Sequence, residues 1–181
     1  MTKRLLLLRH AQSDAAYEGE DKGRPLTPKG MSDALALGEH LRQYGLIPDY
    51  VLCSDAWRTR ETLEKLRESF SDVLSPSHIE FVPAFYHGNE EDYLARIQSC
   101  DDVHKCVLVI GHYPNIPTLL SMLAAPSEKI TFSLLSGYRP ATLSVISCPV
   151  EQWKMLDPTS TNTLTDVITS DDYGAQRRLI R

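Results

Sequence analysis

The stretch that decides the fold lies close to the start of the chain, where residues 4–9 read RLLLLR. A run of leucines without polar alternation is typical of a strand that is covered on both faces, as in a parallel sheet. The run KCVLVI at residues 105–110 has the same character. We therefore expect these two runs to be central strands of one sheet.

Helix and strand signals alternate outward from these runs. Thr27 followed by Pro28 is typical of a helix start, and the apolar spacing after it predicts a helix that ends near Gly45. The next segments are predicted as a strand at 50–53, a helix that Ser54 or Asp55 caps, a strand at 79–82, a helix at 90–98 and a helix after Pro114. This alternation predicts an α/β fold, with a mostly parallel central sheet flanked by helices on both faces.

The C-terminal part of the chain has a different pattern. Residues 141–147 and 152–156 are predicted to be two further strands separated by Pro149, a candidate antiparallel hairpin at the sheet edge. The sequence from Asp157 begins DPTSTNT and is rich in turn formers, which favours a partly ordered extension. We expect one domain over residues 1–156 and an extension over 157–181 that is not a separate domain.

Charge and hydropathy exclude some partners. The chain has 19 basic and 24 acidic residues and a formal charge of -5, so the basic excess of a nucleic-acid-binding protein is missing. The apolar run from Leu5 to Leu8 is far shorter than the roughly 18 residues that span a bilayer. We expect no nucleic-acid or membrane partner and a cytoplasmic location.

The four cysteines give no sign of a metal site or a disulfide framework. They form no CxxC pair and have no closely spaced histidine partners. We expect buried, reduced thiols, no metal and no cofactor.

Cations and imidazoles follow three of the predicted strands. Arg9 and His10 end the first strand, Arg58 follows the strand at 50–53, and His112 follows the run at 105–110. Ligands of such sheets bind beyond the carboxyl ends of the strands, so these side chains are expected to converge. Two guanidinium groups can hold the oxygens of a phosphoryl group while a neutral imidazole attacks it.

These residues also carry a family resemblance. Residues 7–11 (LLRHA) resemble the RHG motif of the histidine phosphatase superfamily, which also contains the cofactor-dependent phosphoglycerate mutases, with Ala11 where the motif has glycine. Alanine at this position, together with residues 24–30 (RPLTPKG), is similar to the SixA-type phosphohistidine phosphatases. Residues 54–62 (SDAWRTRET) resemble the second-arginine segment of the family, and residues 111–114 (GHYP) its second-histidine segment. The resemblance extends from Leu5 to about Leu123.

The resemblance implies a role for each matching residue. His10 falls on the nucleophile, which becomes phosphorylated transiently, and Arg9, Arg58 and His112 fall on the phosphate-binding residues. Ser13 is a candidate for one more hydrogen bond to the phosphate. Residues two apart on a helix do not face the same way, so only one of Arg58 and Arg60 can point toward the phosphate. The family match favours Arg58.

The implied activity is that of a phosphoglycerate mutase-like, metal-independent phosphohydrolase with a role in signal transduction. Phosphohistidine on a protein is the favoured substrate, since imidazole has a conjugate-acid pKa of about 6.5 and leaves without the proton donor that an alkoxide needs. No proton donor can be assigned among Asp14, Asp55, Glu90 and Glu91. Two alternatives stay open: a small-molecule phosphomonoesterase, and a phosphate-recognition module that does not hydrolyse its ligand.

Arg24 also has two interpretations. It lies in the polar stretch that follows the first strand, on the edge where ligands bind. It can contact substrate, or it can pair with Asp21.

Overall fold

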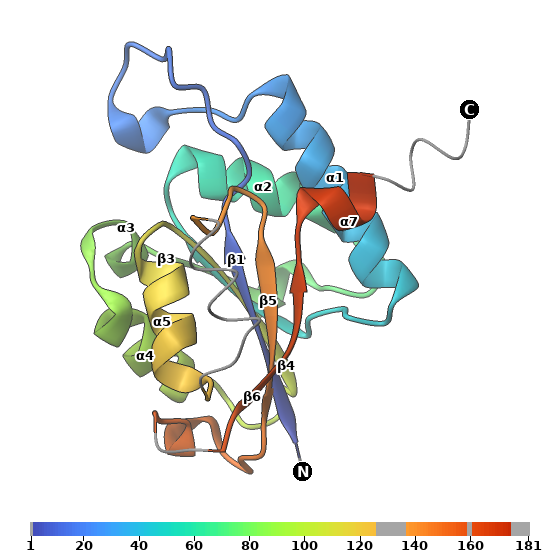
Figure 1. Ribbon diagram of the computed structural model, residues 1–181, viewed down its shortest axis with the longest axis vertical. Coiled ribbons are helices and arrows are strands. Elements are labelled where there is room, and N and C mark those ends of the chain that lie inside the picture. The colour runs from blue at the N-terminus through green and yellow to red at the C-terminus, as the bar shows by residue number, and fades with distance from the viewer. Residues whose placement is uncertain (1, 126–136, 159–160, 175–181) are drawn as a thin grey trace.

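A computed structural model of the chain describes residues 2–125, 137–158 and 161–174. Strands and helices alternate along most of it (Figure 1). The strands are β1 (Lys3–Arg9), β2 (Tyr50–Ser54), β3 (Ile79–Val82), β4 (Cys106–Gly111), β5 (Leu143–Cys148) and β6 (Thr163–Ile168). The helices are α1 (Pro28–Gln43), α2 (Trp57–Arg67), α3 (Ala84–His87), α4 (Glu90–Gln98), α5 (Asn115–Leu123) and α7 (Ser170–Gly174), with short 3-10 helices η1 (Asp21–Gly23), η2 (Pro76–His78) and η3 (Trp153–Met155).

The strands form one sheet in the order β3-β2-β4-β1-β5-β6. Strands β3, β2, β4 and β1 are parallel, whereas β5 runs antiparallel to both β1 and β6. The predicted α/β fold with a mostly parallel sheet is therefore confirmed. Among the described residues, no helix combines the length and the apolar character that crossing a membrane requires.

The leucines of β1 bind the two layers of helices to the sheet. Leu5 and Leu7 pack into the apolar cluster that includes side chains of α4 and α5. Leu6 and Leu8 pack on the opposite face, with side chains of α1 and α2. All four are completely buried, and burying a leucine side chain contributes about 1.5–3 kcal/mol. This double coverage is the physical reason why the run is apolar without alternation.

The two helices that flank the ligand edge begin in different ways. In α1 the Thr27 hydroxyl accepts a hydrogen bond from the backbone N–H of Gly30, as the sequence predicts. In α2 the N-cap is Ala56, so the prediction of Ser54 or Asp55 as the cap is wrong. The Ser54 hydroxyl instead contacts the His112 ring, 2.8 Å from Nε2.

The predicted strand at residues 152–156 is also wrong. Residues Trp153–Met155 form η3, and the Trp153 side chain is fully buried, with its Nε1–H donating to the His104 carbonyl at 2.9 Å. The apolar pattern there reflects the burial of this tryptophan. The antiparallel edge strand is β6, so part of the segment expected to be a partly ordered extension pairs with β5 and extends the sheet past residue 156.

Candidate active site

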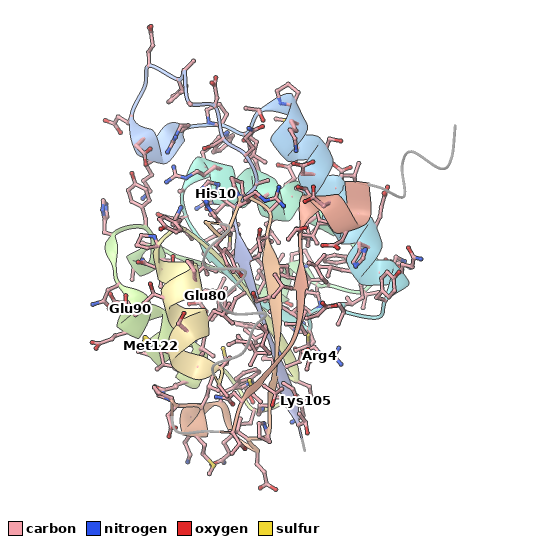
Figure 2. The ribbon with its side chains drawn as sticks, viewed as in Figure 1. Arg4, His10, Glu80, Glu90, Lys105 and Met122 are labelled. Carbon is pink, nitrogen blue, oxygen red and sulfur yellow. The ribbon has the colours of Figure 1, made fainter. Side chains whose placement is uncertain are left out.

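The carboxyl ends of β1 and β4 bring two histidines together. Arg9 is the last residue of β1 and pairs in register with Gly111 of β4, so His10 and His112 leave the sheet side by side. The backbone N–H of His10 donates to the Gly111 carbonyl at 3.0 Å, and the two imidazole centroids are 5.4 Å apart. Figure 2 shows His10 at this end of β1, with Arg4 at the opposite end.

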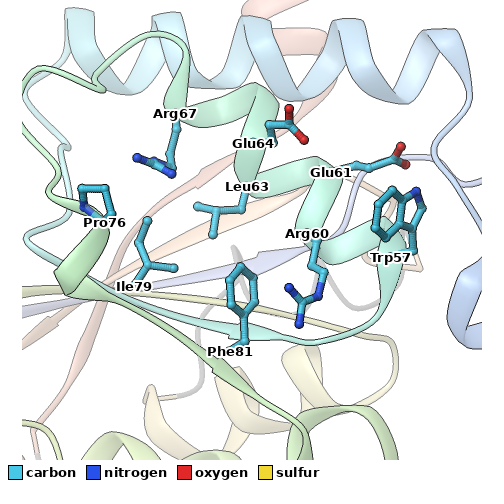
Figure 3. Close-up of a pocket in the computed structure, with 9 residues that line it drawn as sticks. All are labelled: Trp57, Arg60, Glu61, Leu63, Glu64, Arg67, Pro76, Ile79 and Phe81. Carbon is cyan, nitrogen blue, oxygen red and sulfur yellow. The ribbon is translucent and has the colours of Figure 1, made fainter.

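Arg58 reaches the same place from the first turn of α2. Its side chain is only 6% exposed, and its charge acts on both imidazoles. Arg60, two residues on, lies instead 3.9 Å from the ring centroid of Phe81 and donates through Nε to the Asp55 carbonyl at 3.0 Å. It lines a separate groove of about 340 Å³ between α2 and β3 (Figure 3). The structure thus brings Arg58, and not Arg60, to the two histidines.

A hydrogen bond fixes the tautomer of His10. Its Nδ1 lies 2.7 Å from the Ala11 carbonyl oxygen, which can only accept, so Nδ1 carries the proton and a neutral ring keeps its lone pair on Nε2. Thr62 holds this turn, because its hydroxyl accepts from the Ala11 N–H at 3.0 Å and donates to the Arg58 carbonyl at 2.6 Å. One threonine therefore ties the His10 turn to the first turn of α2.

The other three side chains each have at least one anchored nitrogen and one buried nitrogen without a partner among the described residues. Arg9 donates through Nη1 to the Tyr138 carbonyl at 2.9 Å, and His112 contacts Ser54 through Nε2. In these three side chains, Arg9 Nε, Arg58 Nε and His112 Nδ1 are buried and have no partner among the described residues. A buried polar group without a partner costs about 1–3 kcal/mol, so an anion that accepted hydrogen bonds from these three nitrogens would remove that cost.

Burial keeps both histidines neutral. Burial lowers the pKa of His10 to about 3, and the positive charges of Arg58 and Arg9 act in the same direction. Burial lowers the pKa of His112 to about 4, with the charge of Arg58 as the next largest cause. Both imidazoles are therefore uncharged at neutral pH, and His10 is in the form that can act as a nucleophile.

These lowered pKa values make stability depend on pH. An unfolded histidine takes up a proton near pH 6.5 while the folded one does not, so the unfolded state gains stability as pH falls from about 6.5 to the folded pKa. The free energy of unfolding should fall by about 2 kcal/mol for each buried histidine between pH 7 and about pH 5. Urea titrations of wild type and His10→Asn at several pH values measure this fall in the free energy of unfolding. The fall should be smaller in the variant by the contribution of one histidine, about 2 kcal/mol. Parallel stability curves for the two proteins would contradict the assignment.

Asp21 is a site residue that the sequence analysis did not select. Its carboxylate accepts hydrogen bonds from Arg58 at 3.1 Å, from the Tyr86 hydroxyl at 3.0 Å and from Arg24 at 2.6 Å. Arg24 therefore pairs with Asp21, which is one of its two predicted interpretations. The available signal was the position of Asp21 in the polar stretch that leaves β1 at the ligand edge.

Ser13 is the remaining candidate for a contact to phosphate. Ser13 forms an isolated backbone bridge with Leu26, and a hydrogen bond from its hydroxyl to phosphate stays a prediction.

The four candidate proton donors are spread over three elements. The Asp14 carboxylate accepts from a backbone N–H two residues on, and Asp55 forms an ion pair with Lys22 of η1 at 2.6 Å. Glu90 and Glu91 lie in the first turn of α4, and Figure 2 shows Glu90 well away from His10. None of the hydrogen bonds described for Asp14 and Asp55 goes to His10 or His112.

Metal-ligating side chains do not gather in the described part of the chain. No group of three or more His, Cys, Asp or Glu residues there could hold a metal ion. The four cysteines are free and buried, which confirms the prediction of buried thiols.

Fold and site together define an α/β protein in which two arginines and two histidines lie at the carboxyl ends of its parallel strands. Residues 5–80 match the model of the histidine phosphatase superfamily (branch 1). The chain is also 31% identical over 120 residues to an uncharacterized protein of Mycobacterium tuberculosis, covering 66% of this chain and 72% of that one. The chain belongs to the histidine phosphatase superfamily, as the sequence motifs indicate.

Two further relatives extend the comparison. An uncharacterized chloroplastic protein of Arabidopsis thaliana is 33% identical over 141 residues, which cover 72% of this chain and 63% of that protein. The structure of a candidate phosphohistidine phosphatase SixA from Nakamurella multipartitia is 28% identical, with a TM-score of 0.74 over 93% of this chain and 96% of that one. The family and this likeness support a phosphatase activity.

Proposed function

We propose that the chain is a phosphohydrolase that works through a covalent phospho-His10 intermediate, with phosphohistidine on a protein as its favoured substrate. One observation carries the proposal. The neutral His10 ring, with Nδ1 held by the Ala11 carbonyl, stands beside buried nitrogens of Arg9, Arg58 and His112 that have no partner among the described residues. Phosphoryl transfer requires a nucleophile next to hydrogen-bond donors that can bind the phosphoryl oxygens.

Each residue has a role in the first step. The Nε2 lone pair of His10 attacks phosphorus, the bond from phosphorus to the leaving nitrogen breaks, and its electron pair stays on that nitrogen. The substrate ring leaves as a neutral imidazole because its other ring nitrogen carries a proton, and His10 keeps its Nδ1 proton and becomes a positively charged phosphoimidazole ring. The guanidinium groups of Arg9 and Arg58 donate to the phosphoryl oxygens and stabilise the charge on them. The Ser54 hydroxyl can donate to Nε2 of His112. In that tautomer Nδ1 of His112 carries the proton and can donate to a phosphoryl oxygen as well.

Water completes the reaction in the second step. It attacks the phosphorus of phospho-His10 from the side that the leaving group has vacated, and the bond to Nε2 breaks. Inorganic phosphate leaves with the water oxygen, a proton goes to solvent, and His10 returns to its neutral form. The two guanidinium charges take the part that metal ions have in many phosphoryl-transfer enzymes, so metal independence is part of the proposal.

The substrate preference follows from the leaving group. An imidazole leaves with a conjugate-acid pKa of about 6.5 and needs little help, whereas an alkoxide needs a positioned acid. The likeness to a protein named as a candidate phosphohistidine phosphatase supports the same substrate class. A cytoplasmic location stays a prediction, and the Arabidopsis relative is described as chloroplastic.

A small-molecule phosphomonoesterase is the second candidate. The observation that favours it is the Asp21 carboxylate, which is close enough to His112 to act on its pKa. An ester substrate needs a proton donor in that position, whereas the hydrogen bond from Tyr86 and the charges of Arg58 and Arg24 hold the pKa of Asp21 below its usual value, so phosphohistidine remains the favoured substrate.

A substrate panel separates the two candidates. We expect kcat/KM for phosphohistidine to exceed that for alkyl phosphate esters by roughly 100-fold, the lower end of what general acid catalysis contributes. Phosphate release is measured at matched substrate concentrations, with and without a chelator, which should not change the rate. Faster hydrolysis of the esters would favour the phosphomonoesterase, and tight binding without any phosphate release would favour the recognition module.

A further inference from the structure

The Asp21 carboxylate joins three separate segments beside the candidate active-site residues Arg58 and His112. It accepts from Arg58 of α2, from Tyr86 of α3 and from Arg24 of its own loop. The backbone carbonyl of Asp21 accepts a further hydrogen bond from Arg58 Nη1 at 2.8 Å. A single residue of η1 thus holds Arg58 through both of its terminal nitrogens.

The contacts to Asp21 use only one edge of the guanidinium. Nη1 and Nη2 of Arg58 are bonded to Asp21, while Nε is buried and has no partner among the described residues. A guanidinium is planar and rigid, so fixing the terminal edge also fixes the direction of the Nε edge. Arg9 has the same pattern, with Nη1 held by the Tyr138 carbonyl and Nε unpartnered.

Asp21 is built to remain a carboxylate. Partial burial raises its pKa, but the hydrogen bond from Tyr86 and the charges of Arg58 and Arg24 outweigh burial, so that the pKa lies below its usual value. The Tyr86 ring also lies over Arg58, 5.8 Å from the guanidinium carbon, and 5.9 Å from the His112 ring. Tyr86 therefore donates to Asp21 and also lies against Arg58 and His112.

We propose that Asp21 is a positioning residue for the phosphatase reaction: it holds the Arg58 guanidinium by its terminal edge so that the Nε edge faces the phosphoryl oxygens. This inference rests on the proposed function and names a residue that acts through Arg58 without touching the reacting atoms. Without the Asp21 carboxylate, Arg58 would keep only the hydrogen bond from Nη1 to the backbone carbonyl. The substrate would then have to order the rest of the guanidinium, which weakens binding and slows the first step.

Two variants of equal charge isolate this role. Asp21→Asn and Asp21→Ala both remove the negative charge, but only asparagine keeps an acceptor oxygen within reach of Arg58. Hydrogen bonds to charged groups are the stronger kind, so tungstate should bind Asp21→Asn about tenfold more tightly than Asp21→Ala. The same comparison in an Arg58→Ala background should give equal affinities, because the partner through which Asp21 acts is gone.

Kinetics add a second readout. With phosphohistidine, kcat of Asp21→Ala should fall about tenfold below that of Asp21→Asn. Equal tungstate affinity and equal kcat for the two variants would overturn the proposal. So would an Asp21→Asn enzyme as slow as Asp21→Ala with unchanged tungstate binding, since this would make Asp21 a proton donor.

Controls keep the result interpretable. Circular dichroism shows whether each variant is folded, and Asp21→Ser replaces Asp21→Ala if the alanine variant does not fold. Tungstate titration needs no turnover, so it reports on Asp21 even if wild type fails to hydrolyse phosphohistidine. That failure would count against the proposed function and not against the positioning role.

Discussion

Replacing His10 by asparagine is expected to lower turnover by roughly 10⁴-fold or more, the scale on which loss of a nucleophile acts. Asparagine is smaller than histidine and its amide N–H can still donate toward the Ala11 carbonyl that holds Nδ1 in the wild type. It has no lone pair comparable to Nε2, so the covalent step is lost while the turn is kept. Phosphate release under single-turnover conditions measures the effect.

The control for this substitution is another histidine-to-asparagine change. His78 is exposed and lies in η2, at the start of β3 and away from the carboxyl ends of the strands. His78→Asn should keep activity within about twofold, as surface substitutions do. An active His10→Asn enzyme would show that another group attacks phosphorus.

Replacing Arg58 by alanine is expected to lower kcat/KM by roughly 10²- to 10³-fold. Removing one preorganised hydrogen-bond donor to the charge of a transition state lowers the rate by about this factor. Arg58 is suited to this role because its side chain is 6% exposed and its Nε has no partner among the described residues. The effect should appear in tungstate affinity as well as in the rate.

Arg60→Ala is the matched control, since Arg60 leaves the same helix toward Phe81 and the groove beside β3. This variant should keep kcat/KM within about threefold, because no phosphoryl contact is lost. Similar losses in both variants would mean that the arginines act through the stability of α2. Normal activity in Arg58→Ala would show that Arg58 does not bind the phosphoryl group in the reaction.

Local signals were sufficient for the four parallel strands and for placing the four candidate side chains at their carboxyl ends. Leu5 to Leu8 are buried on both faces, so their unbroken apolar run reports directly on a central strand. In a parallel sheet, the residue after such a strand has to lie at the ligand edge. His10 and His112 therefore became neighbours through the register of β1 and β4 alone.

The remaining parts depend on contacts that leave no local trace. The Tyr138 carbonyl that holds Arg9 is distant in sequence, and any residue type supplies a carbonyl. The edge strand β6 follows a turn-rich segment, whose composition concealed it, whereas the apolar residues around Trp153 form a 3-10 helix. The role of Asp21 depends on three donors that converge on it from different segments, and the polar sequence around it does not indicate them.

Detection of the covalent intermediate tests the central claim most directly. Wild-type protein is mixed with phosphohistidine substrate, quenched at alkaline pH within one turnover, digested and analysed by mass spectrometry. If His10 is the nucleophile, the peptide that contains His10 carries one added phosphoryl group, and the same peptide of His10→Asn carries none. A phosphoryl group on a different residue, or phosphate release in a burst with no labelled peptide, would contradict this claim.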